Sequence, residues 1–67
     1  RHKGMTFLQF VTQYRLNTAC GLLKHSQKSV SEICYLVGFC DLPHFIRVFT
    51  KEKGMSPGKY RKDNLAI

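Results

Sequence analysis

The chain has 67 residues, is 43% hydrophobic and carries a formal net charge of +7. A chain this short forms one small domain or part of one, and its apolar content argues against disorder. So strong a positive charge predicts a polyanionic partner, namely DNA, RNA or an anionic membrane surface. The alternative is a solvated basic surface within a larger assembly.

The three cysteines, Cys20, Cys34 and Cys40, argue against a disulfide scaffold and a metal site. Their odd count fits poorly with a secreted protein, and no pair has the C-x-x-C spacing of zinc ligands. We expect no metal and no cofactor, with each cysteine a small buried residue in a reducing cytoplasm. No signal peptide is visible, and the apolar-leaning stretch 7–23 contains too many polar residues to span a membrane.

The first predicted helix covers Thr6–Lys24, with Thr6 as its N-cap. Placed at 100° per residue, its apolar side chains form two clusters on different sides. One cluster is Phe7, Phe10, Val11 and Tyr14, and the other is Leu16, Ala19, Cys20 and Leu23. Such a helix is expected to lie between two subdomains, although it could instead wrap a single small core. Arg15, inside the apolar arc, is expected to pair with Glu32 or Asp41.

A second, short helix follows the polar segment 25–28. Ser29 and Glu32 have the spacing of a capping box, in which each side chain bonds the amide of the other residue. Gly38 supplies the left-handed residue that ends the helix. The expected buried stripe consists of Val30, Ile33, Cys34 and Val37.

After a tight turn at Phe39 and Cys40, Asp41 is placed to cap a third helix that ends at Gly54. Pro43 fits its first turn, and Ser56 and Pro57 begin a last helix that reaches about Asp63. The aromatic residues Phe39, Phe45, Phe49 and Tyr60 have the spacing of a core rather than of a base-stacking platform. The residues predicted to point away from the core are Leu42, His44, Ile46, Arg47, Thr50 and Lys51.

These elements predict an all-α, homeodomain-like helix-turn-helix fold of about four helices, with the motif running from about Ser29 to Phe49. In such a motif the second helix enters the major groove of DNA and the first crosses the backbone. Side chains that could meet phosphates are Arg47, Lys51, Lys59 and Arg61, joined by the helix N-termini at Ser29 and Ser56.

The candidate base-facing residues are Leu42, Pro43, His44 and Ile46. None of them is a bidentate reader such as Arg, Asn or Gln, although the apolar ones could contact thymine methyl groups. His44 could donate one hydrogen bond, or it could be an ordinary surface residue. We therefore expect weak direct readout, with phosphate contacts dominating the affinity and making it strongly salt-dependent.

In order and spacing, nearly the whole chain resembles the AraC/XylS family of bacterial transcription regulators. The residues that carry the resemblance are Arg15, Leu16, Ala19, Leu22 and Leu23, then Ser29, Val30, Glu32, Ile33, Cys34, Val37, Gly38 and Phe39, then Asp41, His44, Phe45, Arg47 and Phe49, and finally Gly54, Met55, Ser56, Pro57, Tyr60 and Arg61. The resemblance implies two helix-turn-helix units joined by a linker helix. Residues 1–4 would be the tail of the first unit, 5–25 the linker, 29–54 the second unit and 56–64 the C-terminal helix.

The resemblance also implies base-facing positions at Leu42, Pro43 and Ile46, with Arg47 on the DNA backbone. Double-stranded DNA would be the partner, RNA polymerase a further one, and the bacterial cytoplasm, at the nucleoid, the location. The sequence does not show whether the parent protein activates or represses.

Two hypotheses about function follow. In the first, the chain is part of a sequence-specific regulator that binds double-stranded DNA. In the second, it is a structural or protein-interaction module, and DNA readout belongs to the first helix-turn-helix unit. No Ser/His/Asp or Cys/His constellation and no Gly-rich phosphate loop is present, so we expect no enzyme. If the side of the linker that carries Phe7, Phe10 and Tyr14 is uncovered, the isolated chain should self-associate.

Overall fold

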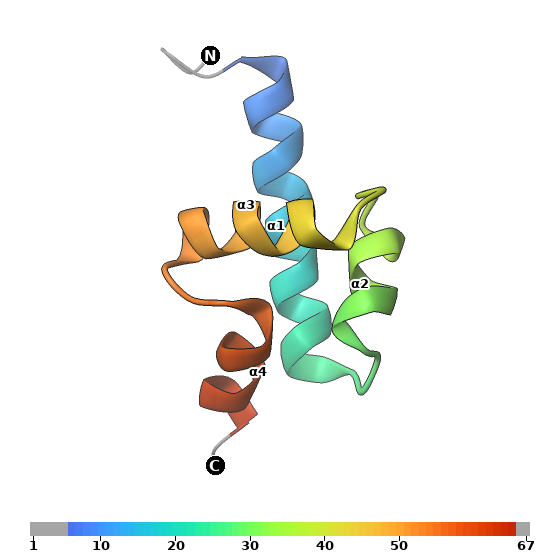
Figure 1. Ribbon diagram of the computed structural model, residues 1–67, viewed down its shortest axis with the longest axis vertical. Helices are drawn as coiled ribbons and strands as arrows, with labels where there is room; N and C mark the ends of the chain where they lie inside the picture. Colours follow the sequence, from blue (N-terminus) through green and yellow to red (C-terminus); the bar gives the residue numbers. More distant parts are fainter. Residues whose placement is uncertain (1–5, 66–67) are drawn as a thin grey trace.

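The computed structural model describes residues 6–65, and the side chains of residues 6–64. It contains helices α1 (Phe7–His25), α2 (Val30–Leu36), α3 (Leu42–Lys53) and α4 (Pro57–Leu65). Figure 1 shows α1 as the long central element, with α3 crossing it and α2 and α4 beside its C-terminal half. The predicted all-α fold is confirmed. The predicted tail at residues 1–4 lies outside the described residues.

The N-terminus of α1 is closed by a capping box. The Thr6 hydroxyl accepts from the Gln9 amide at 3.0 Å, and the Thr6 amide donates to Gln9 Oε1 at 2.9 Å. These bonds satisfy amides that have no partner within the helix. Thr6 was predicted as the cap, and the helix continues one residue beyond the predicted Lys24, to His25.

The predicted signals that begin and end the helix-turn-helix are confirmed. Ser29 and Glu32 form a capping box with bonds of 2.9 and 3.0 Å. Gly38 follows α2 with a φ of 106°, a conformation that strains any residue with a Cβ atom. Asp41 Oδ1 accepts from the His44 amide at the start of α3, at 3.5 Å. Gly54, with a φ of 80°, ends α3.

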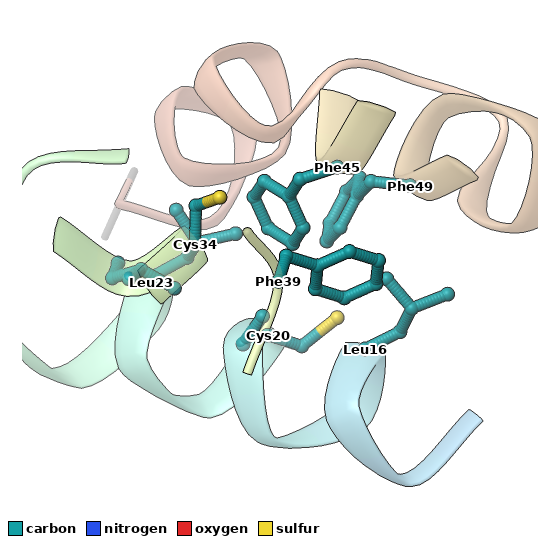
Figure 2. Packing of buried hydrophobic residues seen from close by; sticks show 9 residues of the cluster. Leu16, Cys20, Leu23, Cys34, Phe39, Phe45 and Phe49 are labelled. Carbon is teal, nitrogen blue, oxygen red and sulfur yellow. The ribbon is translucent and has the colours of Figure 1, made fainter. Parts of the chain in front are cut away.

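A compact apolar core joins the helices. Phe45 and Phe49 of α3 are fully buried, and Phe39 from the turn packs beside them (Figure 2). Ring centroids lie 5.1 Å apart for Phe39–Phe45 and 5.8 Å for Phe45–Phe49, in the tilted arrangements that aromatic rings favour. The other buried apolar residues are Leu16, Ala19, Cys20 and Leu23 of α1 and Ile33 and Cys34 of α2. The predicted aromatic core is therefore confirmed.

The last helix attaches to this core through one side. Pro57 is buried, and the half-buried Tyr60 ring meets Phe49 edge-on at 5.6 Å between centroids. The helix reaches Leu65, two residues beyond the predicted end at Asp63. None of the four helices in the described part of the chain has the length and apolarity that a membrane crossing requires.

Three sequence-based expectations are wrong. Cys40 is exposed, because it lies in the bend that connects α2 and α3, whereas Cys20 and Cys34 are buried as expected. Leu42 and Ile46 are half-buried and pack against the core instead of pointing away from it. They share the Phe45–Phe49 side of α3 because residues three and four apart lie on one side of a helix. Arg15 is the third case and belongs to the site described next.

Candidate nucleic-acid interface

The outward side of α3 is formed by exposed residues at helical spacing. They are Pro43, His44, Arg47, Thr50 and Lys51. Because Phe45 and Phe49 hold the opposite side in the core, this side faces solvent along its whole length. Thr50 was not among the predicted site residues, although its position three residues after Arg47 could have indicated it. Its hydroxyl donates to the Ile46 carbonyl at 2.7 Å and keeps its acceptor capacity.

The charges of α3 are sorted between its two sides. Glu52, the helix's one acidic residue, accepts from Gln13 Nε2 of α1 at 2.9 Å. Lys53 donates to Asn17 Oδ1 of α1 at 3.0 Å. Arg47 and Lys51 lie one turn apart on the exposed side, and neither forms an ion pair within residues 6–64. The outward side of α3 is therefore purely cationic.

The four predicted base-facing residues divide into two pairs. Pro43 and His44 are exposed, and the His44 ring lies tilted against Phe39 with 5.8 Å between centroids. Leu42 and Ile46 are half-buried, so only part of each side chain is open to a ligand. All four therefore lie on α3, but Pro43 and His44 are the most exposed to solvent and hence to a ligand.

The predicted phosphate contacts outside α3 differ in what they already bind. Lys59 forms an exposed ion pair with Asp63, at 3.3 Å between Nζ and Oδ2. The Ser56 hydroxyl accepts from the Lys59 amide at 3.2 Å and so caps α4. Ser29 is bonded within its capping box, where the carboxylate of Glu32 already places a negative charge at the start of α2. An anion at Ser29 would meet that charge.

Arg61 is the exception among the predicted phosphate contacts, because its guanidinium is directed into the protein. Its Nε donates to the Leu23 carbonyl at 3.0 Å, and its Nη2 donates to the Ser26 carbonyl at 3.1 Å. Both carbonyls belong to the C-terminal end of α1 and the residue that follows it. A phosphate contact from Arg61 remains a prediction.

Arg15 does not form the predicted ion pair with Glu32 or Asp41; within residues 6–64 the ion pair found is Lys59–Asp63. Instead, the guanidinium lies over Gly38, and a Cβ atom added there would stand 2.9 Å from Arg15 Nε. Glu32 is engaged in the α2 capping box, and Asp41 caps α3. Arg15 packs on the glycine turn, where the absence of a side chain leaves space for its guanidinium.

Between α1 and this turn lies an open groove of about 560 Å³, lined by Leu8, Thr12, Arg15, Gly38, Phe39, Cys40, Asp41, His44 and Val48. Its acidic group, Asp41, precedes α3, whereas Arg15 reaches it from α1. In the part of the chain that the structure describes, no three His, Cys, Asp or Glu side chains gather in a way that could hold a metal ion.

Comparison with known proteins points to one family. Residues 1–63 match the family model described as "Helix-turn-helix domain". The HTH-type transcriptional activator RhaS of Salmonella arizonae is 40% identical over 67 residues, which cover 100% of this chain and 24% of that protein. An uncharacterized HTH-type transcriptional regulator of Haemophilus influenzae is 44% identical over 62 residues, covering 92% of this chain and 21% of that protein. The chain thus spans less than a quarter of the length of these relatives.

A solved structure shares the fold. It is the crystal structure of the C-terminal domain of the two-component response regulator yesN from Fusobacterium nucleatum. The similarity has a TM-score of 0.83 at 34% sequence identity, and it covers 87% of this chain and 56% of that chain.

Proposed function

This chain belongs to the AraC/XylS-type helix-turn-helix family, and we propose that it forms one half of the DNA-binding region of a bacterial transcription regulator. In this proposal α3 lies in the major groove of double-stranded DNA, as the second helix of such a motif does. The relatives named as transcriptional regulators support the regulatory role.

The observation that carries the proposal is the sorting of charge on α3. Glu52 and Lys53 are bonded to α1, whereas Arg47 and Lys51 project from the exposed side. A row of unpaired cations one turn apart can meet successive phosphates of a DNA backbone. Each phosphate neutralised releases counterions, so binding should weaken steeply with salt.

The proposal is tested by titrating a short random-sequence DNA duplex at several salt concentrations. Arg47→Ala should cost about 1–2 kcal/mol of binding free energy, as expected for a lost charge-assisted hydrogen bond, and should lower the salt slope by about 0.9. Lys53→Ala is the matched control, since it removes the same charge from the α1-facing side of the same helix. An affinity that does not change with salt, or equal losses in the two variants, would contradict the proposal.

We propose that the helix-turn-helix unit of this chain reads the DNA sequence only weakly. Of the base-facing candidates, Pro43 and His44 are the most exposed, while Leu42 and Ile46 offer only partly open apolar surface for thymine methyl groups. His44→Ala should therefore change the difference in binding free energy between duplexes of different sequence by less than about 1 kcal/mol. A bidentate contact to a base usually contributes more than this. Competition between duplexes of different sequence measures this difference.

Lys59, Ser56 and Ser29 are proposed as secondary phosphate contacts. The Lys59–Asp63 ion pair is exposed and contributes little, so a phosphate can replace the carboxylate as the partner of Lys59. At Ser56, the N-terminus of α4 presents backbone amides of the first helical turn, where an anion is favoured. Ser29 is the weakest of the three because of the neighbouring Glu32 carboxylate.

A second candidate function is a protein-interaction module whose DNA readout lies in a first helix-turn-helix unit. It is favoured by the exposure of Phe7, Phe10 and Tyr14 on α1, which together offer an apolar surface to a neighbouring subdomain. Footprints of this chain, alone and with the preceding segment of a relative fused to it, distinguish the candidates. Protection of two adjacent major grooves by the longer protein supports DNA contact by both units, and protection of one groove supports the second candidate.

We further propose RNA polymerase as a partner of the parent regulator, and the cytoplasm, at the bacterial nucleoid, as its location. The supporting observation is that one relative is named as a transcriptional activator. Transcription in vitro with purified polymerase, with and without the regulator, tests this.

A further inference from the structure

The half-buried Arg61 joins α4 to the end of α1. We propose that Arg61 is a positioning residue for DNA binding: it fixes the rotation of α4, so that Lys59 faces the DNA, and it does not bind phosphate itself. The inference rests on the proposed function, because it concerns how the DNA surface is held in place. It replaces the interpretation of Arg61 as one more cation on that surface.

The first argument is the direction of the guanidinium. Arg61 donates through Nε to the Leu23 carbonyl and through Nη2 to the Ser26 carbonyl. The carbonyls at the end of a helix lack partners within it, so a cation placed there is favoured both by hydrogen bonding and by the helix dipole. Turning Arg61 towards a phosphate would break both bonds and leave these part-buried carbonyls unsatisfied.

The second argument is the geometry of α4. Two residues apart on a helix means 200° of rotation, so Lys59 and Arg61 point to nearly opposite sides. Pro57, Tyr60 and Arg61 form the inward side, while Lys59, Lys62 and Asp63 are exposed. One DNA backbone therefore cannot meet both Lys59 and Arg61.

The third argument is how α4 joins the rest of the fold. It packs along α1, and its apolar contacts include the buried Pro57 and the edge-on contact of Tyr60 with Phe49. The two hydrogen bonds of Arg61 join α4 to two successive points, Leu23 and Ser26, and so fix its rotation.

The same contact also fixes the connection between α1 and α2. The Ser26 hydroxyl donates to the Leu22 carbonyl at 2.7 Å and accepts from the Lys28 amide at 3.3 Å. Arg61 binds the backbone carbonyl of the same residue. Ser26 thus links the end of α1, the segment that leads to α2, and α4.

The test is a double-mutant cycle in the 67-residue chain, read out as affinity for a random-sequence duplex and as its salt slope. If Arg61 acts through Lys59, Arg61→Gln weakens binding by roughly threefold to tenfold, in line with the value of a hydrogen bond. Lys59→Gln then has less than about a twofold further effect in that background. The salt slope falls by about 0.9 in each single variant and by no more in the double variant.

Two independent phosphate ligands would give a different result. Each single variant would lose about 0.9 of slope, the double variant would lose about twice as much, and the affinities would be additive. That outcome overturns the proposal. A second outcome also overturns the proposal. If Arg61→Gln lowers the free energy of unfolding but the folded variant binds DNA as tightly as the parent, the residue is merely structural.

Two controls separate these cases. The effect of Arg47→Gln should persist in full in the Arg61→Gln background, since α3 is anchored in the core by its own fully buried Phe45 and Phe49. Arg61→Lys keeps the charge but cannot donate to both carbonyls as the guanidinium does, so it should fail to restore binding, whereas a phosphate ligand would tolerate lysine.

The folded fraction of each variant is measured by far-ultraviolet circular dichroism at the titration temperature. If Arg61→Gln is unfolded at that temperature, Arg61→Lys replaces it in the double-mutant cycle, and the same non-additivity with Lys59→Gln is expected. If the parent chain shows no salt-dependent binding and Arg47→Gln has no effect, the proposed function fails. If binding depends on salt and Arg47→Gln weakens it, but the effects of the Arg61 and Lys59 variants are additive, the proposed function stands and only the inference about Arg61 fails.

Discussion

The two halves of α1 have similar apolar content but opposite surroundings. In the N-terminal half, Phe7 is 82% exposed and Tyr14 is 67% exposed, whereas in the C-terminal half Leu16 and Leu23 are fully buried. Figure 1 shows why: the N-terminal half extends past α3, while α2 and α4 flank the other half. An apolar residue type therefore indicates that a surface can be covered, but the fold decides what covers it.

The largest effect should come from the core that covers the buried half of α1. Phe45→Ala removes a fully buried ring that contacts the aromatic cluster over α1, and it should cost about 3–5 kcal/mol of unfolding free energy. Urea denaturation measures the loss. Phe7→Ala on the exposed half is the control and should change stability by less than about 0.5 kcal/mol. Similar losses in both variants would show that the exposed half is packed in solution.

The next effect on stability concerns two glycines, Gly21 within α1 and Gly38 in the turn that Arg15 of α1 covers. Gly38→Ala combines a φ of 106° with a Cβ atom only 2.9 Å from Arg15 Nε, and should destabilise by roughly 1–3 kcal/mol. Gly21→Ala lies within α1, has nothing within 4 Å of the added atom, and should stabilise by about 0.5–1 kcal/mol. Thermal melts of both variants measure the difference. A neutral Gly38→Ala would mean that Gly38 does not adopt the positive φ in solution.

The exposed half of α1 should also drive self-association of the isolated chain. Burial of one phenylalanine contributes about 1.5–3 kcal/mol, so Phe10→Lys should weaken dimerisation by at least about tenfold. Sedimentation equilibrium over a range of concentrations measures this. Tyr35→Lys, at a 55% exposed position on α2, should leave association unchanged. A parent chain that stays monomeric throughout would refute the prediction.

The smallest effect is a loss of stability at alkaline pH. Burial raises the pKa of the Cys34 thiol above its ordinary value of 9.0, with the charges of Asp41 and Cys40 adding to the effect. The folded chain therefore holds this proton more tightly than the unfolded chain. Stability is constant below the ordinary pKa and decreases as the pH rises through the raised value.

Denaturation midpoints from about pH 8 to pH 11 should show this decline. Cys34→Ala should reduce it more than Cys40→Ala, because Cys40 is exposed and its charge is the smallest of the three causes of the raised Cys34 pKa. Part of the decline should remain, because hydrogen bonding with the Cys20 thiol and burial raise the pKa of Tyr60 as well. An equal decline in the parent chain and in Cys34→Ala would exclude Cys34 as a source.

The sequence by itself determined the features that depend on a few neighbouring residues. The N-cap at Thr6, the capping box at Ser29, the glycine stops at 38 and 54, and the four helices follow from local backbone chemistry and were predicted. The buried aromatic residues Phe39, Phe45 and Phe49 also followed from helical periodicity. The predicted cations of α3 were also placed correctly, because spacing alone sets them opposite Phe45 and Phe49.

The tertiary structure alone decided where long or ambivalent side chains go. Arg15 lies on Gly38 and Arg61 on the end of α1, because each side chain can reach several partners and only packing selects one. Leu42 and Ile46 turned out half-buried, because the width of the covered arc of α3 depends on the elements around it. Periodicity gives the direction of a side chain within its own helix, but the partner at that place comes from residues far away in the sequence.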